Sequence, residues 1–406
     1  MLLRHYEKII VGCCFLSFFA NVGLTSTAFS VHQPFIVAIP GIGDTGGSLI
    51  LSTRTLVSLV VMVFVDRYYR LLDVRLGLLI ANLFTVAGFF AYSHAVDLPS
   101  FLIGAVLLGL AYGLGGMVSI TYLVNRWYTN GIGTVVGFVS MGSGLASIAM
   151  PLIVVRIIEA SSLSVAFMVE SGIALALGLT VFALIRNRPS DVGLAPYEKK
   201  PPKRGGARTR LGRKDDTPLP KGERIAILAA MVGVGAFCCC GMTYMSVLAT
   251  SSGFDAIFAA TLVSVAGAAL TAGKFVSGEL FDHLGAARAS ALMFALALVG
   301  FVLCCFVESG SHVLMLIAAV LVGAGLSLGT VGISIWSLDM SDAASRTKEI
   351  KNFQVAYALG GFVANTLPGI VKDLVGSYVV SYAAAAVIAV AATIVVLRYY
   401  RINTRR

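Results

Sequence analysis

Residues 273–288, GKFVSGELFDHLGAAR, end an apolar run with an aspartate, a glycine and an arginine in close succession. A second stretch, MVFVDRYYR at residues 62–70, also ends an apolar run with an aspartate that basic residues follow. Each stretch follows the second long apolar segment of one half of the chain. Charged residues gather where a chain leaves hydrocarbon for water. The two stretches therefore indicate a membrane protein whose halves share one organisation.

The composition is that of a chain built largely of membrane spans. Of the 406 residues, 58% are hydrophobic and 12% are charged, whereas soluble domains are about 25% charged. Apolar stretches near twenty residues recur along the whole length, and about 20 residues cross a hydrocarbon core about 30 Å thick. The predicted spans are 8–31, 47–65, 76–95, 99–124, 131–155, 163–185, 224–250, 256–277, 287–307, 312–336, 352–371 and 378–398.

These twelve spans form two halves of six. Residues 1–185 and 224–406 hold the spans, and residues 186–223 between them are rich in Pro, Gly, Lys and Arg. Such a composition cannot bury a core, so 186–223 is predicted to be a basic cytoplasmic linker. We interpret it as a solvated tether, with binding to anionic lipid head groups as the alternative.

Basic residues occupy alternate loops. The net charge is +10, and nearly all of the 30 Lys and Arg fall on one side of the membrane in the twelve-span arrangement. Positively charged loops face the cytoplasm. Both termini are therefore predicted to be cytoplasmic, and the protein to be multi-pass in the plasma membrane, a bacterial inner membrane. Because the basic residues lie in loops between spans, we expect the protein to associate with the lipid bilayer and not with nucleic acid.

No residues with the pattern of a catalytic or metal site are found. The seven cysteines occur as runs within the predicted spans, and the five histidines fall at or near span ends without the spacing of a ligand set. Free cysteines of this kind behave as small apolar residues. We expect no metal, no cofactor and no enzyme activity, and a monomeric protein.

Two cations, Arg54 and Lys274, lie inside apolar spans at matching places in the two halves. A cation in hydrocarbon is costly and marks a functional site by default. At 1.5 Å per residue, Arg54 lies about 18 Å before Asp66, and Lys274 lies about 12 Å before Asp282. Both then approach the middle of the membrane, where related repeats place their substrate sites between the halves. Two converging cations there would attract an anion.

Each embedded charge has alternative roles. Lys274 shares a helical face with small and polar residues, but it could also extend its stem toward the head groups. Arg54 could instead form an interhelical ion pair. Glu170 is the one acid well inside a predicted span. It is a candidate partner for that ion pair, a proton-coupling residue, or a shallow residue hydrated from outside.

Span 131–155 carries small residues spaced four and three apart, from Gly133 and Gly137 to Ser147. This spacing forms one stripe on a helix, and small stripes let membrane helices approach closely. The stripe is predicted to be either a static packing seam or a face on which bundles slide.

The two opening stretches resemble the Gly-x3-Asp-(Arg/Lys)-x-Gly-(Arg/Lys) loop of the major facilitator superfamily, which has one copy in each half. The first copy has Met62 and Tyr69 in place of its glycines, and the second has His283 in place of a basic residue. The resemblance implies an all-α membrane fold of two six-helix halves related by a pseudo-two-fold axis. It also implies a conformational latch made of Asp66, Arg67, Arg70, Gly278, Asp282, Gly285 and Arg288.

Two short stretches resemble particular branches of that superfamily. Residues 126–128, Arg-Trp-Tyr, and residues 189–196, with Pro189, Gly193 and Pro196, are similar to the monocarboxylate and oxalate/formate branches. The resemblance implies that Lys274, after Gly273, takes the place of a carboxylate-binding arginine. The second basic position of that branch, in span 352–371, is not matched, and Arg54 is expected to substitute for it. The glycine signatures of nitrate transporters are not matched either.

Aromatic residues on spans that commonly flank the cavity of this fold are further candidates for substrate contacts. Packing, or a place in the interfacial aromatic belt, is the alternative for each. They are Tyr112, Tyr122, Tyr244, Trp336 and Tyr357.

The sequence therefore predicts a secondary transporter of a small organic anion, a mono- or dicarboxylate, that works by alternating access. The coupling is either exchange with a counter-anion or symport with protons. The alternatives are an exporter of a neutral or drug-like compound and an anion sensor on the same fold that transports nothing. Embedded cations argue against cationic cargo.

Overall fold

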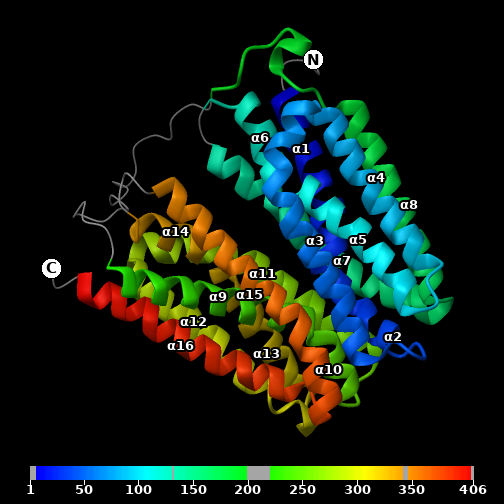
Figure 1. Cartoon of the computed structure of the whole chain (residues 1–406), viewed down its shortest axis with the longest axis vertical. Coiled ribbons are helices and arrows are strands. Elements are labelled where there is room, and N and C mark those ends of the chain that lie inside the picture. The colour runs from blue at the N-terminus through cyan, green and yellow to red at the C-terminus, as the bar shows by residue number, and fades with distance from the viewer. Residues whose placement is uncertain (1–5, 130–131, 199–219, 342–345, 404–406) are drawn as a thin grey trace. The chain divides into compact units, whose positions relative to one another are not determined.

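The computed structural model describes residues 6–129, 132–198, 220–341 and 346–403. These residues form helices, joined by short turns, and one isolated bridge between Tyr128 and Tyr197. The chain divides into two compact units, Met1–Arg204 and Gly205–Arg406. Figure 1 colours unit 1 from blue to green and unit 2 from green to red.

Unit 1 begins with a long helical segment that changes type along its length. An α-helical start is followed by a π-helix, a 3-10 turn and a last short α-helix. These pieces are α1 (Tyr6–Phe18), η2 (Phe19–Thr27), η3 (Phe29–His32) and α2 (Gln33–Val37). The remaining elements are α3 (Gly43–Leu71), α4 (Val74–Ser93), α5 (Leu98–Gly115), α6 (Met117–Trp127), α7 (Ile132–Ala160), α8 (Leu163–Leu184) and η4 (Pro189–Val192).

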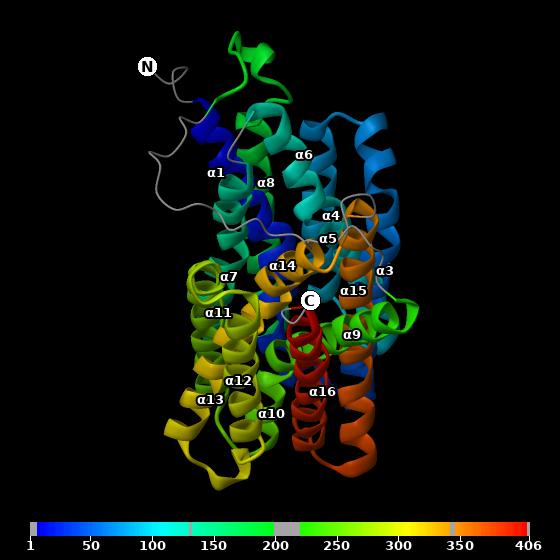
Figure 2. The same cartoon turned by 90° about the vertical axis from the view of Figure 1, so that its left-hand side faces the viewer.

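Unit 2 is built in the same manner. Its elements are α9 (Lys221–Thr243), α10 (Met245–Ser251), α11 (Ala256–Leu284), α12 (Ala286–Cys304), η5 (Val307–Ser309), α13 (His312–Gly325), η6 (Leu326–Gly329), α14 (Val331–Asp339), α15 (Arg346–Val375) and α16 (Val379–Asn403). Within this unit α13 packs against both α11 and α12, and α9 packs against α15 and α16. Figure 2 shows α11, α12 and α13 side by side.

Eleven helical segments of the described chain are long and apolar enough to cross a membrane. The predicted span 352–371 is absent from this set, but it lies within α15, a helix of 30 residues. Gln354, Asn365 and Pro368 make this stretch of α15 less apolar than the other spans. The first predicted span, 8–31, continues in the structure to Val37.

The predicted first, fourth, seventh and tenth spans are each interrupted. The first changes helix type at Phe19, and α5 gives way to α6 at Gly116. In unit 2, α9 gives way to α10 at Tyr244, and η6 separates α13 from α14. The break therefore recurs at every third span in both units. Departures from α-helical hydrogen bonding within a long helix often mark functional positions.

Side-chain caps begin several of the spans. Asp73, Asp97 and Ser162 in unit 1 accept a hydrogen bond from a backbone N–H of the first helical turn, as do Asp255 and Ser311 in unit 2. The Ser100 hydroxyl and backbone N–H also hydrogen bond the exposed Asp97 carboxylate, which lowers its pKa. These caps satisfy backbone donors at helix starts.

Small residues next to the predicted stripe of α7 let the helices approach closely. A Cβ on Gly142 would lie 2.4 Å from the Phe15 carbonyl, and one on Gly23 would lie 2.4 Å from Ala146. A Cβ on Gly137, in contrast, would meet nothing within 4 Å. The tight seam with the first span therefore runs through Gly142 and Ala146, on a neighbouring face of α7.

The closest helix approach in unit 2 predicts a sensitive position. A Cβ on Gly360 of α15 would lie 1.9 Å from the Val232 carbonyl oxygen of α9. We expect Gly360→Ala to force these helices apart and to lower the free energy of unfolding by about 1–3 kcal/mol, the usual range for overpacking. Thermal unfolding of the purified protein measures this. Gly172→Ala is the matched control, because its Cβ would meet nothing within 4 Å; equal unfolding midpoints of the two variants would contradict the prediction.

Candidate functional site

Arg54 lies on α3 with only 6% of its surface exposed. Its Nη1 donates a hydrogen bond to the carbonyl oxygen of Thr25, in the π-helical part of the first span. The guanidinium carbon also lies 5.6 Å from the centre of the Phe29 ring. Arg54 is therefore embedded as predicted, and it is held by the segment where the first span leaves the α-helical pattern.

Phe29 belongs to a buried aromatic cluster that joins the first span, α4, α5 and α8. Its ring centre is 5.6 Å from that of Tyr92 and 6.4 Å from that of Phe167. Phe101 also contacts both Tyr92 and Phe167. Burying such large side chains contributes strongly to packing. The cluster covers one side of Arg54 with apolar rings.

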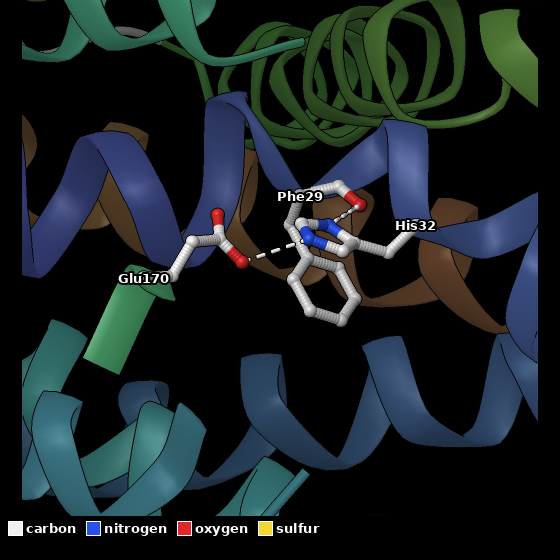
Figure 3. Close-up of polar contacts among 3 residues, drawn as sticks. All are labelled: Phe29, His32 and Glu170. Carbon is white, nitrogen blue, oxygen red and sulfur yellow. Dashed lines mark hydrogen bonds and ion pairs between the residues drawn. The ribbon is translucent and has the colours of Figure 1, made fainter. Parts of the chain in front are cut away.

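His32 and Glu170 form a fully buried pair beside Phe29. The His32 Nε2 lies 2.8 Å from Glu170 Oε2, and both side chains are inaccessible to water. The His32 Nδ1 lies 3.2 Å from the Phe29 carbonyl oxygen, and its ring stacks on Phe167 at 4.7 Å. Figure 3 shows the carboxylate and the imidazole pointing toward each other beside the Phe29 ring.

This arrangement decides between the roles that the sequence leaves open for Glu170. A shallow residue hydrated from outside is wrong, because Glu170 is 0% exposed. Its ion-pair partner is His32 and not Arg54. The role in proton coupling stays a prediction.

His32 is the residue that sequence reasoning missed. It was placed at the end of the first predicted span, without a partner. In the structure the span continues to Val37, so His32 lies within it. The available signal was the polar run of Asn21, Thr25, His32 and Gln33, in a stretch that is otherwise apolar enough to span.

Lys274 lies on α11 and is half-buried. Within the described part of the chain, its ammonium group makes no hydrogen bond or ion pair. The next two residues, Phe275 and Val276, are 55% and 53% exposed and lie on the lipid-facing side. Lys274 therefore turns away from the most lipid-exposed face of its helix, as its small and polar stripe predicts.

The packing of α11 explains how Lys274 is placed. Gly273 lies against Ala324 of α13, where a Cβ would be 3.0 Å from the carbonyl oxygen. About two turns earlier, Ala266 of α11 contacts Gly323 of the same neighbour. These contacts fix the rotation of α11 about its axis and thus the direction of the lysine.

Two of the predicted aromatic contacts are committed to the core of unit 2. Trp336 is fully buried, its Nε1 donates to the Ser290 hydroxyl at 2.9 Å, and its ring stacks on Phe294. Tyr244 is also fully buried, and its hydroxyl donates to the Asn365 carbonyl oxygen at 2.8 Å. Both rings and their polar groups are thus occupied by protein contacts.

The other aromatic candidates are partly accessible. Tyr112 on α5 and Tyr357 on α15 are half-buried. Tyr357 packs against Gly235 of α9 and Gly329 of η6, at the break in the tenth span. Tyr122 lies under the Arg126 guanidinium at 4.5 Å and accepts a hydrogen bond from it, so it belongs to a helix end.

The first copy of the latch motif is helical and not a loop. Residues 66–70 lie in the last turns of α3, which ends at Leu71. The Asp66 side chain lies outside the described part of the structure, and Arg67 and Arg70 are exposed. Tyr68 and Tyr69 hydrogen bond the carbonyl groups of Gly77 and Leu114, and burial raises the pKa of Tyr68 to about 12.

The second copy also ends a helix. Gly278 and Asp282 lie on α11, and Gly285 follows it with a φ of +77°. That conformation favours glycine, so the motif glycine ends α11 and turns the chain into α12. Asp282 and Arg288 are exposed. The latch therefore stays a prediction.

A basic cavity of about 390 Å³ adjoins the first copy. It lies at the ends of α3 and α6 and beside η4, and Arg70, Arg126 and Arg188 line it together with Asp73 and Asp191. No group of three His, Cys, Asp or Glu in the described residues could hold a metal ion.

The family model described as the Major Facilitator Superfamily matches residues 13–307. The chain belongs to this superfamily. It is a multi-pass membrane transporter with the all-α fold of that family, and not an enzyme. Members of the superfamily bind small-molecule substrates and are commonly monomeric. No curated protein sequence matches the chain.

Solved structures with the same fold cover almost the whole chain at low identity. A nucleoside transporter, NupG, is 11% identical with a TM-score of 0.73, and the match covers 95% of this chain and 98% of that one. A peptide transporter, POT, in complex with sulfate is 13% identical with a TM-score of 0.72 and coverages of 97% and 95%. An inward-facing bacterial homologue of the human lysosomal transporter Spinster is 12% identical, with a TM-score of 0.67 and coverages of 99% and 98%.

The contacts of Trp336 predict a role in packing. Ser290→Ala would leave the buried indole N–H without an acceptor, which costs about 1–3 kcal/mol. We expect a lower unfolding midpoint and unchanged ligand affinity, measured by thermal unfolding and by uptake into proteoliposomes. Ser334→Ala, an exposed serine of the same unit, is the control. Weaker affinity at unchanged stability would instead make Trp336 a substrate contact.

Proposed function

We propose that this transporter moves a small organic anion, a mono- or dicarboxylate, by secondary transport with alternating access. The observation that carries the proposal is the placement of one cation inside an apolar span of each unit. Arg54 and Lys274 are the groups that recognise the negative charge. Coupling is to a counter-anion or to protons.

The surroundings of Lys274 support this role. An embedded ammonium group is costly without a partner, and the described residues provide it with no acceptor. An anionic cargo would supply the missing charge while it is bound. The resemblance of Gly273-Lys274 to the oxalate/formate branch points to the same chemistry.

Arg54 supports it from unit 1. The guanidinium group has five N–H donors in a planar fork that matches a carboxylate. Nη1 is used by the Thr25 carbonyl, and the Phe29 ring orients the plane. Tyr112 and Tyr357, which are both half-buried, are the proposed secondary contacts.

We also propose that the chain lies in the plasma membrane, a bacterial inner membrane, with both termini in the cytoplasm. The distribution of lysine and arginine among the loops supports this orientation. The helix ends with Asp66, Arg67, Arg70, Gly278, Asp282, Gly285 and Arg288 then face the cytoplasm and act there as the latch.

Removing either embedded charge tests the proposal. Arg54→Gln and Lys274→Gln are each expected to raise the KM for anion uptake by roughly 10- to 100-fold, because a hydrogen bond to a charged group is worth about 1.5–3 kcal/mol. Uptake of formate, lactate, oxalate, succinate and nitrate into proteoliposomes measures this. Lys274→Arg keeps the charge and should retain uptake.

Arg156→Gln is the matched control, because it removes an exposed cation at the end of α7. Normal uptake by the Arg54 or Lys274 variant would remove that residue from the site. Stabilisation of the purified protein by uncharged compounds alone would favour the exporter of neutral cargo. Anion binding without counterflow would favour the sensor.

A further inference from the structure

The His32–Glu170 pair is isolated from water. Both side chains are fully buried, and His32 Nε2 lies 2.8 Å from Glu170 Oε2, an ion-pair distance. Among the residues that the structure describes, His32 Nε2 and both carboxylate oxygens have no hydrogen-bond partner. An acid and a base have thus been placed together where only the Phe29 carbonyl group, at His32 Nδ1, accepts a hydrogen bond from either of them.

The geometry determines how many protons the pair holds. The Phe29 carbonyl oxygen, 3.2 Å from His32 Nδ1, can only accept, so Nδ1 carries a hydrogen. A neutral imidazole has one protonated nitrogen, and Nε2 is then bare. An ionised carboxylate is also only an acceptor. Two bare acceptors at 2.8 Å would repel each other, so one more proton has to be shared by the pair.

This shared proton cannot leave while the pair is buried. Its loss would bring two acceptors face to face and leave an uncompensated carboxylate charge away from water, which is strongly unfavourable. Release therefore requires that the pair separate or that water reach it.

We infer that His32 and Glu170 form the proton-carrying site of this transporter and that it operates as a proton symporter. The pair takes up one proton when it is open to water, holds it while it is buried, and returns it to water when it opens again. The inference rests on the proposed function only in taking an organic anion as the cargo.

A single irregular segment links the proton site to Arg54. Thr25, in the π-helix, accepts the hydrogen bond from Arg54, and Phe29 and His32 lie on the adjoining 3-10 turn. The Phe29 ring centre lies 5.6 Å from the Arg54 guanidinium carbon and 5.1 Å from the centre of the His32 ring. A shift of this segment would disturb both charges together, which is what coupling requires.

A cavity lies near the pair in the same unit. A cavity of about 350 Å³ lies among the ends of α4, α5, α7 and α8, and Tyr92 and Phe101 line it. Both rings contact Phe167, which stacks on His32. The buried Tyr92 hydroxyl has no hydrogen-bond partner in the described residues. One layer of aromatic side chains thus separates the cavity from the pair.

Few other charged or titratable groups surround the pair in the described structure. Arg54 from α3 and Tyr92 from α4 contact the Phe29 ring, and α8 contributes Glu170 itself. The ionisable residues of α7, Arg156 and Glu159, are exposed. Any dependence of transport on pH should therefore arise from the His32–Glu170 pair and should be lost when either residue of the pair is replaced.

Glu170→Gln tests the proposal directly. The glutamine amide can donate to Nε2 of neutral His32, so the variant reproduces the loaded pair but cannot release a proton. In proteoliposomes that contain a pH-sensitive dye, wild type should couple uptake of formate, lactate or oxalate to proton entry and accumulate the anion when the outside is acidic. The variant should lose proton entry and anion accumulation, yet it should retain exchange of internal for external anion.

Glu159→Gln, which removes an exposed carboxylate of the same unit, is the control and should behave as wild type. Accumulation and proton entry by Glu170→Gln equal to those of wild type would overturn the inference. Loss of exchange as well would also overturn it, because Glu170 would then be needed for anion movement itself. Arg54→Gln, in contrast, should lose exchange and accumulation together.

A measurement without cargo separates this inference from the proposed function. A free histidine is neutral above about pH 6.5. If the buried pair keeps its proton there, as the proposal requires, the folded chain binds one proton more than the unfolded chain. Stability should then fall as pH rises. The unfolding midpoint of wild type should drop between about pH 6.5 and pH 9 more than that of Glu170→Gln. Unfolding midpoints that change equally with pH in wild type and in Glu170→Gln would overturn the inference, even if no anion of the panel is transported.

Discussion

Hydrocarbon offers no hydrogen-bond partner, so each polar group within the spans has to be satisfied by another part of the chain. In unit 1 these contacts join the first span to its neighbours. Asn21 accepts a hydrogen bond from Thr85 of α4, and Asn82 of α4 donates to the Ala174 carbonyl of α8. The Thr25–Arg54 hydrogen bond and the His32–Glu170 pair continue this pattern. The interior of unit 1 is therefore held by specific polar contacts as well as by apolar packing.

The breaks at every third span place irregular backbone among well-packed helices. Tight glycine contacts hold the regular helices, as at Gly360 against α9 and Gly142 against α1. The irregular segments differ, because their change of helix type alters which carbonyl groups are available to side chains. Thr25 and Phe29 both use such carbonyls, one for Arg54 and one for His32. The embedded side chains of Arg54 and His32 thus contact irregular backbone that is surrounded by regular helices.

Much of the fold could be predicted from the sequence, because hydrophobic runs, caps and charge placement are local signals. Asp73, Asp97 and Asp255 start helices where a polar residue precedes an apolar run. The family was recognised from degenerate motif copies, although the first copy proved to be the last turns of a helix, and the second spans the end of α11, the turn at Gly285 and the start of α12. The candidate site was predicted only in part. Arg54 and Lys274 stand out in sequence because charges are rare there, but the partner of Glu170 could not be found, since His32 lies far from it in the chain.

The sequence by itself determined the membrane location, the helical class, the two-part organisation and the position of the embedded charges. These properties depend on composition and on spacing along the chain. The tertiary structure decided which charges meet. It buried Glu170 against His32, committed Trp336 and Tyr244 to the core, and turned Lys274 away from the lipid-exposed side of α11. Such contacts join residues distant in sequence, and they depend on helix rotation and on close approach at small residues, which no local pattern specifies.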